Sequence, residues 1–487
     1  MRALLVTSIG VACAGALLLP LAPTESAESM LNGKRSTSVE DGAPPLAARG
    51  EGGLRGDAAE GDGSISGSTR SLTLRAPGGG TRAGDKLLSA WEDDPSGGRR
   101  VTSRKVKPFS LVGMVWDDPA AAPPGRLQVQ TRSSATKRWT PWRTLNAHAD
   151  GSPSPGERAR KGKKVLGASA PLWVGDSTAV RVRIVPDAKD AKDAKDAKDA
   201  KDAKDRSKAR GAGEAALPKG ARLELVDPGK AAGSGARAGD RAREEDPAKR
   251  PGGVLPALNR GDTRAIYGED AADATPSKKD RAEDTHIGPR PQIITRKGWG
   301  ADESLREPQF GYGRTTKAAF VHHSAETNNY DCADVPAIIR SIYRYHVKSS
   351  GWRDLGYNFL VDKCGKIYEG RAGGAAKPVT GAHTLGFNTD TTGIAVLGTY
   401  SKAKPSKAAK DALAKLTAWK LGVHGVDASG KVTLTSEGGT KHKKGNKVTF
   451  NAVSGHRDGF STECPGEQLY RELPAVRTEA GRLQGRR

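Results

Sequence analysis

The sequence predicts two folded regions of different class: a small all-β module in residues 68–228 and an α/β domain in residues 291–487. The first region holds short runs that alternate apolar and polar residues or are rich in β-branched residues, with turn signals between them. The second region alternates strand-like runs with segments of helical periodicity, as a single α/β domain does. The remaining segments are rich in Gly, Ala and charged residues and offer little to a hydrophobic core.

Five strand-like runs predict the all-β module. They are Ser71–Leu74, Phe109–Trp116, Leu127–Thr131, Val180–Pro186 and Leu223–Val226. In the fourth run, Arg181 and Arg183 flank Val182, so one face is apolar and the other is charged, which is typical of a half-buried strand. Because turn signals separate the runs, we expect a small sandwich.

Four tryptophans fall in the predicted module. They are Trp116, Trp139, Trp142 and Trp173. Side chains of this size either fill a core or offer a flat face on which a sugar stacks. We favour core packing over a sugar-stacking platform.

Residues 1–27 are expected to be a cleaved secretory signal. Arg2 gives a short positive start, and the apolar core that follows is shorter than the roughly 20 residues that span a bilayer. It ends in small residues at Glu25-Ser26-Ala27, which resembles a signal-peptidase site. An uncleaved anchor is the alternative. We therefore expect a secreted or cell-wall-associated protein with no membrane span after cleavage.

Three further segments are expected to lack a packed core. Residues 28–67 are rich in Gly, Ala, Ser and charge, and we expect them to be disordered. Residues 187–205 repeat Asp-Ala-Lys, which places like charges three residues apart and weakens any helix, so this segment is an insertion in the module. Residues 229–290 have the composition of a linker.

Strands and helices alternate in the α/β domain. Strands are predicted at Ala318–Val321, Tyr357–Val361 and Gly393–Leu397. A helix is predicted from Asp334 to Lys348, because apolar residues recur three and four apart and a proline stands in the first turn. A second helix is predicted from Ser406 to Leu421, between a good N-cap and a glycine.

The chain is strongly basic, with 79 Lys+Arg against 56 Asp+Glu and a formal net charge of +23. Such a charge attracts polyanions of any kind. The secretory signal and the lack of a nucleic-acid-binding motif disfavour a nucleic-acid binder. The basic run Lys441–Lys447 is expected to be an exposed loop, and anionic wall polymers are a candidate partner for it.

Seven of the nine histidines lie between His322 and His456. One predicted strand ends in His322-His323, and His456 is followed eight residues later by Cys464. One histidine of the first pair, with His456 and Cys464, gives two imidazoles and one thiolate. A catalytic zinc site uses three such ligands and leaves a fourth position for water. On pattern alone, a buried histidine pair with an unpaired cysteine is the alternative.

The four cysteines are consistent with this set. Cys13 leaves with the signal and Cys464 belongs to the metal set, so Cys332 and Cys364 remain as a pair that can form a disulfide in an oxidising compartment. No His-Glu-x-x-His motif is present. His456-Arg457-Asp458 lacks the companion motifs of a kinase catalytic loop, so we reject a kinase.

From Trp299 to about Pro465, the sequence closely resembles the peptidoglycan recognition protein family, also called the type 2 amidases, which includes the phage T7 lysozyme amidase. The matching blocks are Arg296–Gly300, Phe320–Ala325, Gly351–Val361, Tyr368–Arg371, Gly381–Thr384, Gly393–Ala395 and Gly455–Arg457 with Cys464-Pro465. They cover roughly a third of the chain and say nothing about residues 28–290. The composition resembles that of an actinobacterial member.

The resemblance implies a mixed β-sheet flanked by helices, with zinc at one end of a groove. By position, the family's zinc ligands fall on His322, His456 and Cys464. His323 then points elsewhere, the catalytic tyrosine falls on Tyr357, and Thr462 stands two residues before the cysteine ligand. The implied activity is zinc-dependent hydrolysis of the amide between N-acetylmuramic acid and L-alanine in peptidoglycan.

The resemblance also implies a substrate groove lined by Trp299, Trp352, Arg371 and His383. Arg371 suits a bidentate contact with the free carboxylate of a diaminopimelate side chain, although a structural salt bridge is equally consistent. Asp458 is either a partner of a ligand histidine or an ordinary surface residue.

Two other functions compete with an amidase. One is a peptidoglycan-binding or sensing protein without catalysis, which loss of Cys464 or Tyr357 would have favoured; both are present. The other is a structural wall protein whose β-module and basic linker bind the wall.

Overall fold

The computed structural model describes residues 67–74, 92–93, 99–103, 106–119, 121, 123, 126–146, 164–185, 217–229, 252–273 and 286–486. The expected signal at 1–27, residues 28–66 of the expected disordered segment and the repeat at 187–205 lie outside these ranges. None of the helices in the part of the chain that is described has the length and apolarity needed to cross a bilayer.

The first folded region is an antiparallel β-structure, as expected from the sequence. Its strands are β1 (Ser68–Thr73), β2 (Glu92–Asp93), β3 (Arg99–Ser103), β4 (Phe109–Trp116), β5 (Arg126–Ser133), β6 (Arg143–Leu145), β7 (Gly167–Ala168), β8 (Leu172–Val185) and β9 (Arg222–Asp227). Their order is β1-β9-β4-β8-β3-β2. Off this path, β5 pairs with β8 and with β6, and β7 pairs with β4. Three of the five strand-like runs lie wholly within one of these strands. The run Ser71–Leu74 extends one residue beyond β1, and the last residue of Val180–Pro186 lies outside the described residues.

Strand β8 connects the two halves of the module. Its first half pairs with β4, and its second half pairs with both β3 and β5. Val180 and Val182 are fully buried, whereas Arg181 and Arg183, which alternate with them, are only partly buried. The alternation seen in the sequence therefore places one face of this strand in the core.

The four tryptophans divide into two pairs. Trp116 and Trp173 are buried, which confirms core packing for them. Trp139 and Trp142 are partly buried, and the guanidinium groups of Arg181 and Arg183 lie over their rings at 4.0 and 4.3 Å. These cation–π contacts cover ring faces that a sugar would need.

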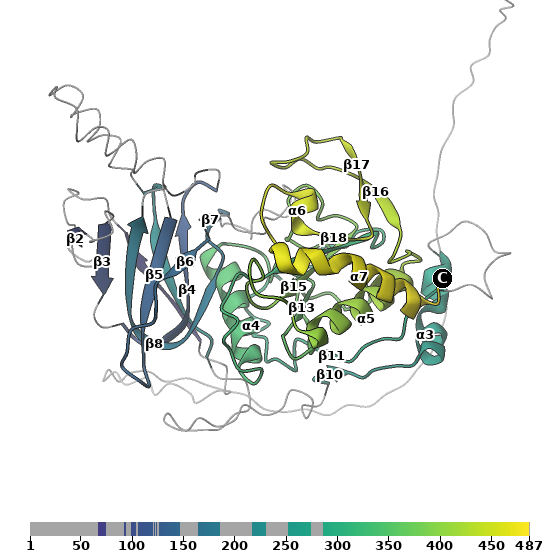
Figure 1. Ribbon diagram of the computed structural model, residues 1–487, viewed down its shortest axis with the longest axis horizontal. Coiled ribbons are helices and arrows are strands. Elements are labelled where there is room, and N and C mark those ends of the chain that lie inside the picture. The colour runs from purple at the N-terminus through teal and green to yellow at the C-terminus, as the bar shows by residue number, and fades with distance from the viewer. Residues whose placement is uncertain are drawn as a thin grey trace, which may run out of the picture. The chain divides into compact units, whose positions relative to one another are not determined.

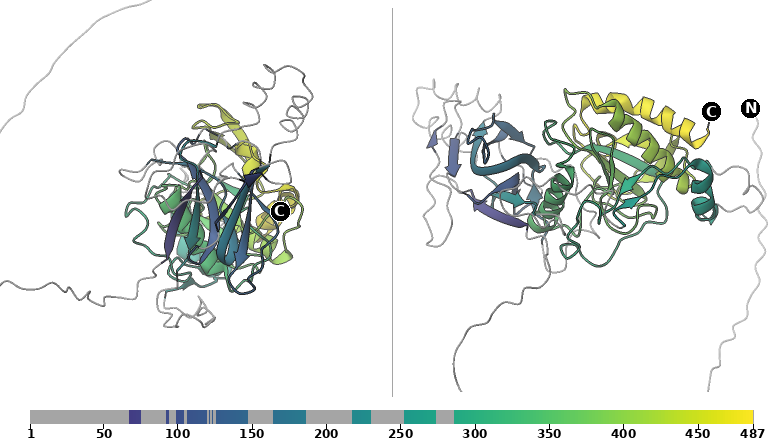
Figure 2. Two further views of the ribbon diagram at one scale, coloured as in Figure 1. Left: turned by 90° about the vertical axis from the view of Figure 1, so that its left-hand side faces the viewer. Right: turned by 90° about the horizontal axis from the view of Figure 1, so that it is seen from below.

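The second folded region contains a seven-stranded mixed sheet with the order β10-β11-β14-β13-β15-β12-β18 (Figures 1 and 2). Its strands are β10 (Val254–Leu255), β11 (Ile293–Ile294), β12 (Ala318–His323), β13 (Phe359–Val361), β14 (Ile367–Glu369), β15 (Thr391–Val396) and β18 (Val453–Gly455). Its helices are α3 (Arg260–Asp273), α4 (Val335–Arg344) with a π-turn at Tyr345–Ser349, α5 (Lys407–Val423), α6 (His456–Gly459) and α7 (Glu467–Gln484). A separate hairpin joins β16 (Lys431–Thr435) to β17 (Lys447–Asn451).

The sequence misplaced the start of this region. Strand β10 and helix α3 both fall within residues 229–290, which we expected to be a linker. Strand β10 pairs with β11, and α3 packs against α5, where Tyr267 makes an edge contact with Trp419. The short length of β10 and the polar composition of α3 explain why neither gave a periodic signal in the sequence.

The two faces of the mixed sheet are covered by different helices. Val321, Phe359 and Ile394 belong to the core on the side of α5 and α7, which lie side by side (Figure 2). Leu360 and Ala395 belong to the core on the side of α4. His322 pairs with Ala395 and so points to the α4 face, because successive side chains of a strand alternate.

The two folded regions belong to one compact unit, in which α4 with its π-turn contacts strands β4 and β9. The Tyr345 hydroxyl lies 3.0 Å from the carbonyl oxygen of Met114 and 3.1 Å from that of Ser169. A Cβ atom on Gly113 would fall 2.4 Å from the Tyr345 ring, so the close approach requires glycine there.

Candidate metal centre

Three potential metal ligands converge at the end of strand β12. One ligand atom from each of His322, His456 and Cys464 lies within 4.8 Å of the other two. The parallel pairing of β12 with β18 causes this, because Val321 pairs with Gly455 and the next residue of each strand is a histidine. The two imidazole centroids are 4.4 Å apart, and the turn before α7 supplies the thiol.

The hydrogen-bond partners of the two histidines fit a metal site. The Nδ1 atom of His322 lies 3.8 Å from the Cys464 sulfur, while its Nε2 atom lies 3.5 Å from the Thr384 hydroxyl. Neither ring nitrogen of His456 has a hydrogen-bond partner among the described residues, although the side chain is buried. Buried polar groups are almost always satisfied, so this imidazole has the environment of a ligand whose partner is an ion.

The electrostatic environment keeps these imidazoles neutral. Burial lowers the pKa of both His322 and His456 well below the ordinary value, and neighbouring imidazoles lower it further. A metal ligand must be a neutral imidazole, so the environment favours the binding form. Zinc takes imidazole nitrogen and thiolate sulfur as ligands, and a catalytic zinc site uses three protein ligands. The residues present therefore fit a zinc ion.

His323 lies beside this cluster but points away from it. Its Nδ1 atom accepts a hydrogen bond of 3.4 Å from the Tyr400 backbone N–H, and its own backbone N–H donates to the Cys464 sulfur at 3.4 Å. Burial, and then the charge of Arg457, lower the pKa of its imidazole to about 4. Its backbone, not its imidazole, contacts the potential ligand.

Tyr357 and Thr462 both lie next to the three ligands. The Tyr357 ring centroid is 5.3 Å from that of His322. The segment around Tyr357 is fixed on both sides: the Gly356 N–H donates to His346 Nδ1 at 3.2 Å, and the Arg371 N–H donates to the Tyr357 carbonyl at 2.8 Å. The Thr462 hydroxyl accepts a hydrogen bond of 3.1 Å from the Cys464 N–H.

The four residues expected to line a groove are all buried, and one of them is wrongly assigned. Trp299 is fully buried and donates from Nε1 to the Glu369 carbonyl at 2.7 Å, so it has no surface for a substrate. Its indole fills the core beneath α4, which is why a groove role is wrong for it.

The other three expected groove residues are buried in different surroundings. His383 is fully buried, its ring centroid is 5.3 Å from that of His322, and its Nδ1 atom is 3.0 Å from the Thr384 hydroxyl. Burial, and then the charge of Arg371, lower the pKa of His383 to about 3. Trp352 is 5% exposed and packs on His346, with ring centroids 4.3 Å apart. Arg371 is 7% exposed and is therefore the most accessible of the four.

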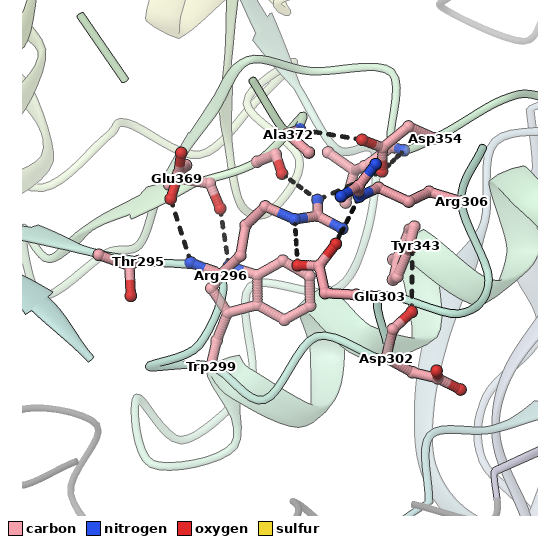
Figure 3. Close-up of polar contacts among 12 residues, drawn as sticks. Thr295, Arg296, Trp299, Asp302, Glu303, Arg306, Tyr343, Asp354, Glu369 and Ala372 are labelled. Atoms are coloured by element: carbon pink, nitrogen blue, oxygen red, sulfur yellow. Dashed lines mark hydrogen bonds and ion pairs between the residues drawn. The ribbon is translucent and has the colours of Figure 1, made fainter. Parts of the chain in front are cut away.

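A buried polar network around Arg296 was missed by the sequence reasoning (Figure 3). The Arg296 guanidinium donates to Glu303 at 2.8 Å, to Asp354 at 3.2 Å and to the Gly370 carbonyl. Its backbone N–H donates to Glu369 at 3.2 Å. The carboxylate of Asp354 also accepts the backbone N–H groups of Leu355 and Ala372.

This network connects three of the sequence blocks that looked functional. Arg296 comes from the first, Asp354 from the block that contains Tyr357, and Glu369 from the block that ends in Arg371. Although burial acts to lower the pKa of Arg296, the charges of Asp354 and Glu303 raise it above its ordinary value overall. These residues hold the segments that carry Tyr357 and Arg371, and they do not themselves line the metal centre.

The predicted disulfide is present. Cys332 and Cys364 are bonded with a Cα–Cα distance of 6.5 Å, and they join the loop before α4 to the turn between β13 and β14.

Asp458 does not contact a ligand imidazole: its carboxylate accepts the Gly455 N–H at 2.8 Å and the Tyr470 hydroxyl at 2.7 Å, which fixes the start of α6.

Comparison with known proteins identifies the family of the second region. The N-acetylmuramoyl-L-alanine amidase family model matches residues 312–467. Peptidoglycan-recognition protein SC2 of Drosophila melanogaster is 32% identical over 184 residues, which are 37% of this chain and 84% of that protein. The chain belongs to the peptidoglycan recognition protein family.

Other family members show the same likeness. N-acetylmuramoyl-L-alanine amidase of Homo sapiens is 32% identical over 185 residues, which are 37% of this chain and 27% of the human protein. The crystal structure of peptidoglycan recognition protein-LE in complex with tracheal cytotoxin is 30% identical in sequence. The match covers 38% of this chain and 92% of that chain, with a TM-score of 0.30. The family includes amidases and recognition proteins without catalysis. Residues 69–209 match a second family model, described as Rv3811 N-terminal galactose-binding domain-like.

Proposed function

We propose that this chain is a secreted, cell-wall-associated, zinc-dependent N-acetylmuramoyl-L-alanine amidase that hydrolyses the amide between N-acetylmuramic acid and L-alanine in peptidoglycan. The observation that carries the proposal is the convergence of His322, His456 and Cys464, with both ring nitrogens of a buried His456 left without partners among the described residues. A protein that only binds its ligand has no need for such a set.

His322, His456 and Cys464 would hold the ion. Zinc held there would supply a Lewis acid for the scissile carbonyl and an activated water for attack on it. The chain contributes the orientation of its ligands: the Thr384 hydroxyl at His322 Nε2 leaves Nδ1 for the ion, as an outer-shell partner does in other metal sites.

Three side chains would act on the substrate. The Tyr357 hydroxyl would donate a hydrogen bond to the oxygen on which negative charge develops, and such a donor contributes most in a site from which water is excluded. Thr462 would offer a second hydroxyl from the segment that leads to Cys464. Arg371, whose backbone N–H donates to the Tyr357 carbonyl, would bind a carboxylate of the stem peptide.

Digestion of purified peptidoglycan by the full chain, with zinc or with a chelator, tests the proposal. Mass spectrometry should show intact stem peptides with free L-alanine amino termini, and the chelator or Cys464→Ala should abolish their release. His424→Asn is a matched control, because this histidine lies outside the cluster and its Nε2 atom contacts the Ala376 carbonyl. Binding to peptidoglycan without cleavage under any metal condition would favour a recognition protein.

A further inference from the structure

The hairpin Lys431–Asn451, here called the basic hairpin, projects beside α6 next to the metal centre (Figure 1). It carries five lysines and one glutamate, a net charge of +4. The lysines are Lys431, Lys441, Lys443, Lys444 and Lys447, and all five are exposed. Nothing in the metal centre uses them, so the charge requires a separate explanation.

The two faces of the basic hairpin differ in chemistry. Val432, Leu434, Val448 and Phe450 face inward and pack with Phe320 and Phe387. Lys431, Thr433, Thr435, Lys447 and Thr449 alternate with them and face outward. The inner face explains why the hairpin folds onto the domain. The outer face shows only ammonium, hydroxyl and amide groups, with no carboxylate.

Four of the five lysines of the basic hairpin have no partner for their ammonium groups among the described residues. Lys431, Lys443, Lys444 and Lys447 form no ion pair or hydrogen bond from their ammonium groups to another described residue. The single carboxylate of the hairpin, on Glu437, accepts the Thr389 hydroxyl at 2.5 Å. Four ammonium groups are therefore available to an external anion.

The hairpin tip is fixed to both segments that border the metal centre. On one side, Lys441 donates to the Arg457 carbonyl at 2.5 Å, and the Ser461 N–H donates to Thr440 at 3.3 Å. On the other side, the Glu437 N–H donates to the Gly386 carbonyl at 2.8 Å. The imidazole of His442 packs between them against Phe387, with ring centroids 5.6 Å apart. A polymer held by the hairpin would thus be kept at a fixed position beside the metal centre.

We propose that the basic hairpin is a docking surface for a phosphodiester-linked anionic polymer of the cell wall, which it holds beside the metal centre. This inference rests on the proposed function only for the location of the polymer. Lysine binds phosphate as a point charge, whereas recognition of a planar carboxylate favours the guanidinium fork, which the hairpin lacks.

Two other polyanions fit the hairpin less well. Single-stranded nucleic acid is bound through aromatic side chains on which bases stack, and the one aromatic ring of the hairpin besides His442, that of Phe450, is buried in the core. An anionic membrane surface is bound through basic residues together with apolar side chains that enter the bilayer, and the outer face offers none. A regular phosphate polymer needs only spaced cations.

Co-sedimentation of the full chain with two preparations of Gram-positive sacculi tests the proposal. One preparation retains its covalently attached phosphodiester polymer, and the other has been stripped of it with hydrofluoric acid. The wild-type chain should bind the first about tenfold more tightly, because several exposed charge pairs of modest strength add up. The difference should shrink as salt is raised, since exposed charges are screened.

The combined variant Lys443→Gln, Lys444→Gln and Lys447→Gln should lose this preference. A control that removes three equally exposed lysines elsewhere, Lys297→Gln, Lys366→Gln and Lys415→Gln, should keep it. Circular dichroism melting shows whether each variant is folded. Hydrolysis of a small soluble muropeptide should be unchanged in the hairpin variant. If the wild-type chain does not hydrolyse this substrate, the amidase proposal fails independently of the binding result.

Three outcomes would overturn the proposal. The first is equal binding of the wild-type chain to both preparations of sacculi. The second is an equal loss of preference in the control variant, which would indicate that net charge alone is responsible. The third is binding of duplex DNA or of vesicles containing anionic lipid as tightly as polymer-bearing sacculi, with the same dependence on the three hairpin lysines.

Discussion

Two buried polar clusters lie in the same domain, and they differ in whether the chain satisfies them. In the Arg296 cluster, the guanidinium, Asp354 and Glu369 have partners within the chain (Figure 3). In the metal centre, His456 is equally buried but neither ring nitrogen has a partner among the described residues. Burying polar groups is unfavourable in both places, and only one of the two clusters recovers that free energy by itself.

The difference shows how a structural cluster can be told from one that requires a ligand. Both clusters were built from residues in the sequence blocks that resemble the family, so the resemblance alone could not separate them. Completeness of hydrogen bonding does separate them. Removing one member of the Arg296 cluster should destabilise the folded domain. Removing one ligand residue of the metal centre should leave the domain folded but without its ion. Each prediction below tests one side of this contrast.

The largest effect is expected for Cys464→Ala. The variant should lose zinc binding, and with it the stabilisation that a bound ion gives, about 4 kcal/mol when free zinc is a thousand times its dissociation constant. Without zinc, the wild-type chain and the variant should melt at similar temperatures. Calorimetric melting with zinc and with a chelator checks this, and retention of one tightly bound zinc per chain in the variant would contradict the proposed ligand set.

Arg296→Met should lower the stability of the domain and leave zinc binding intact. It leaves the buried carboxylate of Asp354 without its cation, which typically costs about 3–5 kcal/mol of unfolding free energy. Urea unfolding measures this loss, with Lys297→Met as the control because Lys297 is exposed. The folded fraction of the variant should still bind zinc. If stability were unchanged and zinc lost, Arg296 would belong to the metal centre instead.

Tyr357→Phe should lower kcat for peptidoglycan cleavage by about 10²–10³-fold, the typical effect of removing one oxyanion donor. Zinc affinity and melting temperature should stay the same, because the tyrosine is not one of the three converging ligands. Tyr343→Phe is a matched control, since its buried hydroxyl donates to the Asp302 carbonyl outside the centre. An equal fall in kcat for both variants would indicate a general effect of lost tyrosine hydroxyls.

The sequence predicted the elements with strong periodicity and missed those without it. Helix α5 begins at its predicted N-cap, Ser406, because the cap and the apolar spacing agree. Strand β10 and helix α3 were assigned to a linker because a two-residue strand and a polar helix owe their structure to the partners against which they pack. Trp299 was assigned to a groove because position in a motif does not tell which way an indole points.

At the candidate site, residue type named His456, Cys464 and one histidine of the pair His322-His323, because imidazole and thiolate bind zinc. The resemblance to the family selected His322 from that pair. Spacing along the chain could not show Thr384, whose hydroxyl contacts both His322 and His383. A threonine has many roles, and its place beside an imidazole follows only from the loop between His383 and β15. Residue type together with the resemblance thus named the candidate ligands, and only the fold identified what orients them.

Thr384→Val should have the smallest effect, and it tests whether a hydroxyl outside the ligand set orients His322. It keeps the side-chain volume but removes the hydroxyl 3.5 Å from His322 Nε2, so zinc affinity should fall about tenfold, as it does when an outer-shell partner is lost. Thr417→Val is the matched control, because that buried hydroxyl bonds to the Leu413 carbonyl within α5. Competition with a fluorescent chelator measures both affinities. If the two variants bound zinc with equal affinity, packing alone would orient His322, and the Thr384 hydroxyl would have no part in zinc binding.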